Sequence, residues 1–125
     1  MKPIQTDKAP QAIGPYSQGI RVGDLIFFSG QVPLDPKSGV IVGTDIQAQT
    51  RKVMENIQGL LQSQGLDFTR VVKSTVFLTN MGDFAAFNEI YASFLKAPYP
   101  ARSTVQVSAL PKGALVEIEC VVLAG

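Results

Sequence analysis

The chain has 125 residues, of which 46% are hydrophobic and 17% charged, and its net charge is +1. This size and composition predict one compact domain over residues 1–125 with a real hydrophobic core. The near-neutral charge, with no basic run, argues against a nucleic-acid partner. No histidine is present, which excludes serine–histidine and cysteine–histidine catalysis and histidine-ligated zinc.

The single cysteine, Cys120, allows no internal disulfide and fits a reducing compartment, so we expect a cytoplasmic protein. No segment approaches the roughly 20 apolar residues of a membrane span, and we expect no membrane association. One thiol, scattered carboxylates and the lack of a glycine-rich phosphate loop predict neither a metal site nor a cofactor. Cys120 falls on an apolar strand face, which indicates an inert core thiol.

The first third of the chain predicts β-structure interrupted by loops. Gly23-Asp24 is a hairpin signal between two runs rich in apolar residues. In chain order we expect a short edge strand at residues 3–8, a fixed loop at Ala9–Ser17, strands at Gln18–Val22 and Leu25–Gly30, and an exposed loop at Val32–Gly43.

Two amphipathic helices are predicted in the middle of the chain. Thr44 and Gln47 form a capping-box pattern at the start of the first, and Gly65 ends it. Asn80 is the expected N-cap of the second, with Asp83 in its first turn. The apolar stripes that define the two helices are Ile46, Val53, Ile57, Leu60 and Leu61 in the first and Phe84, Phe87, Tyr91 and Phe94 in the second.

A strand at Val71–Leu78 separates the helices, and runs at Ala101–Ser108 and Leu115–Leu123 follow them. This order favours an α+β fold with both helices on one face of a mixed sheet. The other sheet face then needs cover, and further copies of the chain would supply it. The last two runs flank a turn around Pro111-Lys112-Gly113 and read as a hairpin.

Those two runs carry the polar groups that suggest a site. Side chains alternate along a strand, so Arg102 and Thr104 share one face, and Val105 lies on the opposite, buried one. Glu117 and Glu119 likewise share the face opposite the apolar residues of the last run. If the runs are neighbours, a guanidinium and carboxylates look out of the core together, an arrangement suited to a small anion beside an acid or base.

Each candidate also has an ordinary structural interpretation. Arg102 is equally read as a surface arginine in a weak ion pair, and the glutamates as solvated strand residues. Tyr16, at the end of a rigid loop, is either a core-edge aromatic or a site residue. Asn88 is either an exposed helical residue or an anchor near a cleft. Ser29-Gly30 is either a simple strand end or a place where a ligand approaches the backbone.

Four motifs occur in order along the chain: A-I-G-P-Y-S-Q-G, S-G-Q-x-P, P-A-R-S-x-V-x-V-x-x-L-P and V-E-I-E. Together they closely resemble the RidA family, also called the YjgF family, of reactive imine/enamine deaminases, from Ala9 to Leu123. The resemblance implies a chorismate-mutase-like α+β fold, in which the last strand can lie inside the sheet instead of pairing with Ala101–Ser108. It also implies a homotrimer whose sheets pack around a central barrel, with a cleft between each pair of subunits.

The resemblance assigns roles to individual residues. It implies that Arg102 holds the substrate carboxylate and Glu117 positions the attacking water. Tyr16 closes the cleft, from a different subunit than Arg102. Ser29 and Gly30 line the pocket, with Asn88 near it. Many members carry cysteine where this chain has Thr104, and because the implied contact there uses the backbone carbonyl, threonine should serve.

The implied activity is hydrolysis of a 2-imino acid, such as 2-iminobutanoate or 2-iminopropanoate, to a 2-oxo acid and ammonia, without a cofactor. Two other classes stay open at this point. One is a regulatory trimer that binds a small 2-oxo or amino acid without turnover. The other is an endoribonuclease or translation inhibitor, against which the missing histidine and the missing basic stripe argue.

Overall fold

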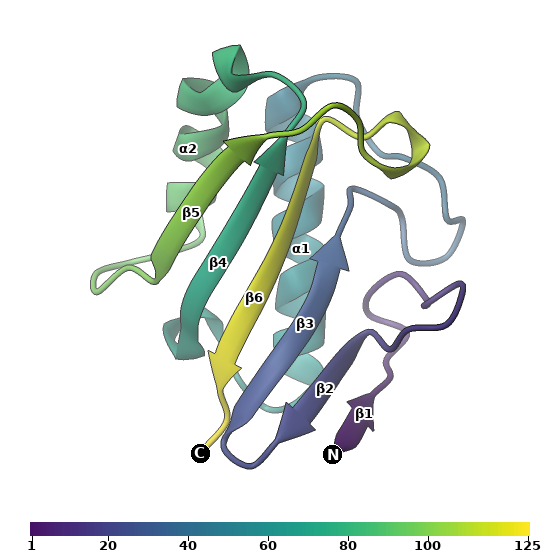
Figure 1. Ribbon diagram of the computed structural model, residues 1–125, viewed down its shortest axis with the longest axis vertical. Helices are drawn as coiled ribbons and strands as arrows, with labels where there is room; N and C mark the ends of the chain where they lie inside the picture. Colours follow the sequence, from purple (N-terminus) through teal and green to yellow (C-terminus); the bar gives the residue numbers. More distant parts are fainter.

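A computed structural model describes residues 1–125 (Figure 1). Its regular elements are β1 (Lys2–Ile4), β2 (Gly19–Val22), β3 (Leu25–Gln31), α1 (Ile46–Ser63), β4 (Val71–Leu78), α2 (Phe84–Ser93), β5 (Ala101–Gln106) and β6 (Val116–Leu123). These elements confirm the predicted order of strands and helices. No helix is long and apolar enough to cross a membrane.

The six strands form one mixed sheet in the order β1-β2-β3-β6-β4-β5. β4 and β5 are parallel neighbours, joined by the crossover through α2, and β6 runs antiparallel between β3 and β4. β4 lies between β5 and β6 (Figure 1), so the hairpin interpretation of these two runs is wrong, and the alternative that the resemblance left open, a last strand inside the sheet, is confirmed. The burial explains this placement: every second residue of β6 is buried, which suits a central strand, whereas β5 is mostly exposed, which suits an edge.

Both helices lie on one face of the sheet, behind it in Figure 1, as predicted. The predicted stripe of α1 is entirely buried, and Phe87 and Tyr91 of α2 are buried in the same core. The N-caps of the two helices differ from the predicted ones, by one residue for α1 and by one element for α2. Asp45, not Thr44, caps α1 by accepting from the Ala48 amide, and Asn80 caps a short 3₁₀ turn that leads into α2.

The opposite, helix-free face of the sheet carries apolar side chains that nothing in the chain covers. Leu25, Phe27 and Leu123 are each more than a third exposed there. Val105, expected to be buried, is 44% exposed on this face, because its pairing with Phe77 places it opposite the helices. The apolar face is consistent with the expected cover by further copies of the chain.

Candidate functional site

A cleft of about 580 Å³ opens where β3 ends and β6 begins. It collects four of the predicted site residues from three distant stretches of the chain: Tyr16, Ser29, Gly30 and Glu117. Ile13, Val32 and Leu34 give it apolar walls, and Lys112 lies at its edge. The cleft thus brings together, within one chain, four of the residues to which the resemblance assigns roles in a site between subunits.

Gly30 and Glu117 are in direct contact across the cleft floor. The register of β3 on β6 shifts between Phe28 and Gln31, so β3 contains one extra residue there, a β-bulge. A Cβ atom built on Gly30 would overlap Oε2 of Glu117 and lie 2.8 Å from its Cδ. Only glycine leaves room for this carboxylate in its present position.

The surroundings of Glu117 make its carboxyl group harder to ionise. Partial burial is the main cause that raises its pKa above the usual value, and the negative charge of Glu119 on the same strand adds to it. A carboxyl group with a raised pKa exchanges protons closer to neutral pH. Glu117 is therefore suited to acid–base work.

The loop that carries Tyr16 is fastened to the end of β3. The Ser29 hydroxyl donates to the Ser17 carbonyl at 2.6 Å, and the Ser29 amide donates to the Gln18 carbonyl at 3.0 Å. The Tyr16 hydroxyl accepts from the Ile13 amide at 3.3 Å, which closes the loop on itself. The Tyr16 ring stays half exposed at the rim of the cleft.

Arg102 lies in a second, separate hollow of about 420 Å³, which Asn88, Tyr91, Tyr99 and Pro100 also line. Its Nη1 donates to Asn88 Oδ1 at 2.7 Å. Its guanidinium carbon sits 5.2 Å from the centre of the Tyr91 ring and 5.3 Å from that of Phe84. Cation–π contact and one hydrogen bond thus fix the guanidinium.

No carboxylate of the chain neutralises Arg102, since the one salt bridge joins Lys52 and Glu55. The remaining N–H groups of a guanidinium form a planar fork that matches a carboxylate. A fixed arginine without a carboxylate partner, in a hollow lined by tyrosines, is chemically suited to binding an anion.

Within one chain the two hollows cannot act together. Ser74 of β4 pairs with both Arg102 and Cys120, and its hydroxyl contacts Tyr91 of α2, so Arg102 lies on the helix side of the sheet. Glu117 pairs with Phe77, which lies three residues from Ser74 on β4 and therefore faces the opposite way. The Glu117 side chain thus points to the helix-free side. Two strand spacings, about 10 Å, also separate β5 from β6. The expectation that both groups look out together from neighbouring strands is wrong for a single chain.

Thr104 and Cys120 are the remaining residues that the sequence singled out. Thr104 lies on the helix side like Arg102 but lines neither hollow, and its buried hydroxyl has no hydrogen-bond partner. Cys120 is buried as expected, and burial raises the pKa of its thiol to about 12. No group of three or more His, Cys, Asp or Glu side chains is placed to hold a metal ion.

Sequence reasoning missed Tyr99 beside Arg102 and Lys112 beside Glu117. Lys112 adopts a left-handed backbone conformation with φ of 57°, and its Nζ donates to the Gly39 carbonyl at 2.9 Å. This bond ties the turn before β6 to the loop that follows β3. The Pro-Lys-Gly sequence signalled a turn but not this contact.

Comparison with known proteins agrees with this architecture. The family described as Endoribonuclease L-PSP matches residues 6–124. Protein DfrA of Myxococcus xanthus is 52% identical, over 96% of this chain and 93% of its own length. The human 2-iminobutanoate/2-iminopropanoate deaminase is 46% identical, over 98% of this chain and 89% of its own length. Escherichia coli TdcF, solved with bound serine, superposes with a TM-score of 0.94 at 43% identity, and each chain is covered completely.

The six-stranded mixed sheet with two helices on one face is the α+β fold of the YjgF-type proteins. The chain belongs to the RidA/YjgF family, to which the Endoribonuclease L-PSP description also applies. Some relatives in this family bear the names of imine deaminases, and these names support a deaminase activity at the level of the family.

Proposed function

We propose that this protein is a 2-iminobutanoate/2-iminopropanoate deaminase that works as a homotrimer, with each site assembled from two chains. The single observation that carries the proposal is the pair of incomplete hollows. One presents a fixed, unpaired guanidinium, the other a carboxylate with a raised pKa, and they open on opposite sides of the sheet. Head-to-tail packing in a ring would bring the Arg102 hollow of one chain against the Glu117 cleft of the next.

The proposed reaction needs modest help from the protein, because imines hydrolyse in water unaided. Arg102 of one chain binds the carboxylate of the 2-imino acid and fixes its C=N bond in the neighbouring cleft. Glu117 accepts a proton from water as the oxygen bonds to C2, and the proton passes to the nitrogen. Glu117 then moves the remaining hydroxyl proton of the tetrahedral intermediate to its amino group, so that the C–N bond breaks, ammonia leaves and the C=O bond of the 2-oxo acid forms. General acid–base help of this kind contributes about 10²- to 10⁴-fold.

A direct test follows the imine in competition with a trap. A pyridoxal-phosphate-dependent dehydratase generates the 2-imino acid in the presence of semicarbazide, and the protein is expected to lower semicarbazone formation. Arg102→Ala should lose most of this effect, because removing a charge-assisted pair costs about 1.5–3 kcal/mol, or roughly 10- to 150-fold. Arg102→Lys keeps the charge and should recover part of it. Full activity in Arg102→Ala would contradict the role of Arg102.

The pH dependence follows from the environment of Glu117. The ionised carboxylate is the active base, and its pKa is raised above the usual 4.5 by burial and by Glu119. As the pH is lowered, the carboxylate becomes protonated and the turnover number should fall, and the midpoint of this fall (the acid limb) should lie above pH 4.5. Glu119→Gln removes one cause of the raised pKa, so its acid limb should move to lower pH. Turnover between about pH 4 and pH 8 checks this, and an unmoved limb would assign it to another group.

One observation favours a second candidate, a trimer that binds a small amino or 2-oxo acid without turnover: the related TdcF was solved with serine bound. An anion site built on Arg102 would serve such a protein equally well. Calorimetric binding of 2-oxobutanoate together with absence of imine turnover would favour this candidate over the deaminase.

A further inference from the structure

We infer that Gln49 and Asn56, two amide side chains buried under the sheet, are positioning residues that set the geometry of the Glu117 cleft. This inference rests on the proposed function of the cleft. Neither side chain lines the cleft, and neither would touch substrate. Both act through the backbone of the segments that form the cleft walls.

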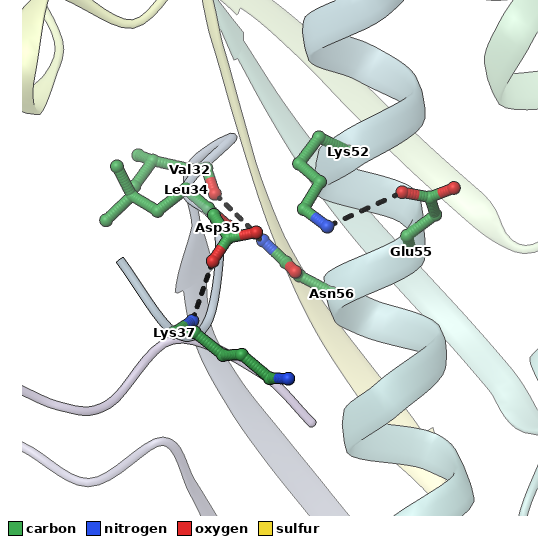
Figure 2. A network of polar contacts seen from close by, with 7 residues as sticks. All are labelled: Val32, Leu34, Asp35, Lys37, Lys52, Glu55 and Asn56. Carbon is green, nitrogen blue, oxygen red and sulfur yellow. Dashed lines mark hydrogen bonds and ion pairs between the residues drawn. The ribbon is translucent and has the colours of Figure 1, made fainter. Parts of the chain in front are cut away.

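Asn56 holds the wall that follows β3. It lies on α1 and is 1% exposed, and its Nδ2 donates to the Leu34 carbonyl at 2.9 Å and to the Val32 carbonyl at 3.3 Å. Figure 2 shows the Asn56 side chain directed from the helix at this segment. Val32 and Leu34 both line the cleft, and Val32 follows Gly30 by two residues. Asn56 therefore sets how far this wall of the cleft lies from α1.

Gln49 holds the opposite wall, at the start of β6. Its Oε1 accepts from the Leu115 amide at 2.8 Å, and its Nε2 donates to the Gly43 carbonyl at 3.1 Å. Leu115 precedes Glu117 by two residues. The side chain is 4% exposed, so water competes little for these bonds. Gln49 therefore fixes the point from which the strand carrying Glu117 starts.

The two residues lie seven positions apart on α1, which is close to two helical turns, so they share one face. Their targets are the two strand ends that meet at the cleft. The β-bulge at Ser29-Gly30 interrupts the ladder between β3 and β6 at this place. β6 stays paired with β4 here, through Glu117 and Phe77, but on the side of β3 the bulge breaks the ladder locally. The two tethers from α1 add a constraint on that side.

The consequence concerns the contact of Gly30 with the Glu117 carboxylate. That contact is so close that a small shift of either strand end would move the carboxylate relative to a bound imine. Displacements of about 1 Å from such remote changes can cost up to 10²-fold in rate. Loss of a tether should therefore lower turnover, while substrate affinity, which depends on Arg102, changes little.

The experiment compares Gln49→Met and Asn56→Leu with two matched controls on the same helix. Thr50→Val removes a buried hydroxyl that has no hydrogen-bond partner. Val53→Ala opens a small cavity at a fully buried position and supplies a loss of stability without loss of a tether. Asn56→Ser, which keeps one donor, replaces Asn56→Leu if the latter does not fold. The measurements are Tm, kcat, KM and amide hydrogen exchange.

We expect both tether variants to lose about tenfold or more in kcat with KM changed less than about threefold. Val53→Ala should lower Tm as much as the two tether variants do, but its kcat should stay at the wild-type value. Thr50→Val should change neither Tm nor kcat. If kcat falls equally in Val53→Ala and in the tether variants, or falls in none of them, the inference is overturned.

Hydrogen exchange separates this inference from the proposed function. Gln49→Met should speed exchange of the Leu115 amide well beyond its rate in Val53→Ala, whether or not the protein hydrolyses imines. A wild-type protein without imine turnover that shows this local difference would refute the proposed function and support the tether. Equal exchange in Gln49→Met and Val53→Ala would refute the tether, whatever the wild-type activity.

Discussion

Mixed oligomers of Arg102→Ala and Glu117→Gln chains are expected to recover activity that neither variant has alone. If Arg102 and Glu117 of one site come from different chains, some sites in a mixed ring receive an intact copy of both. Random assembly from equal amounts gives about a quarter of sites intact, hence about a quarter of wild-type turnover. Each variant alone should be reduced severely, by about 10²- to 10⁴-fold for Glu117→Gln. The semicarbazide competition measures the recovery after joint refolding.

The matched control is the double variant Arg102→Ala/Glu117→Gln mixed with wild-type chains. In that mixture an intact site needs two wild-type neighbours, so activity should again fall to about a quarter, without complementation of one defect by another. If the two single variants stay inactive after verified co-assembly, Arg102 and Glu117 belong to the same chain in each site. That result would require a conformation in which one of them crosses the sheet.

Gly30→Ala is expected to abolish most turnover while leaving the fold intact. Gly30 does not have a positive φ, so alanine meets no backbone strain there. The three atoms nearest to the added methyl group all belong to the flexible Glu117 side chain, which can swing away. The carboxylate then leaves its position, and a misplaced catalytic group costs about 10²-fold in kcat. Tm and steady-state kinetics are the measurements.

A double-variant cycle identifies the cause of that loss. If Gly30→Ala acts by displacing Glu117, then Gly30→Ala/Glu117→Gln should be no slower than Glu117→Gln alone. Additive losses would show instead that Gly30 matters through close approach of its own backbone to the ligand. A large fall in Tm for Gly30→Ala would show that neighbouring backbone, rather than the carboxylate, has to move.

The local elements followed closely from the sequence because their signals are local. The alternation along β6 and the stripe of α1 fix which side chains are buried, and both predictions were confirmed. The pairing of β5 did not follow, because nothing in the two runs says that β4 inserts between them. The cap of α1 was displaced by one residue, since Thr44 and Asp45 both offer an acceptor oxygen.

The candidate site shows the same division. The resemblance to a family brought Tyr16, Gly30 and Glu117 to one pocket, which alternation along single strands does not predict. Alternation along the two strands led us to place Arg102 and Glu117 on the same face of the sheet, and this prediction was wrong. Alternation says which side chains of one strand share a face, but the relative faces of two strands depend on how the chain connects and pairs them. A signal for Gln49 and Asn56 was present, because a polar amide within the buried face of a helix requires a partner.

The division of Arg102 and Glu117 between two sides of the sheet also bears on how the activity would respond to dilution. Under the proposed arrangement an isolated chain owns no whole site, so dissociation of subunits would silence it without unfolding anything. Specific activity then becomes a property of protein concentration, governed by mass action among copies. A cell could tune the flux through such a protein by its abundance alone, more steeply than in simple proportion.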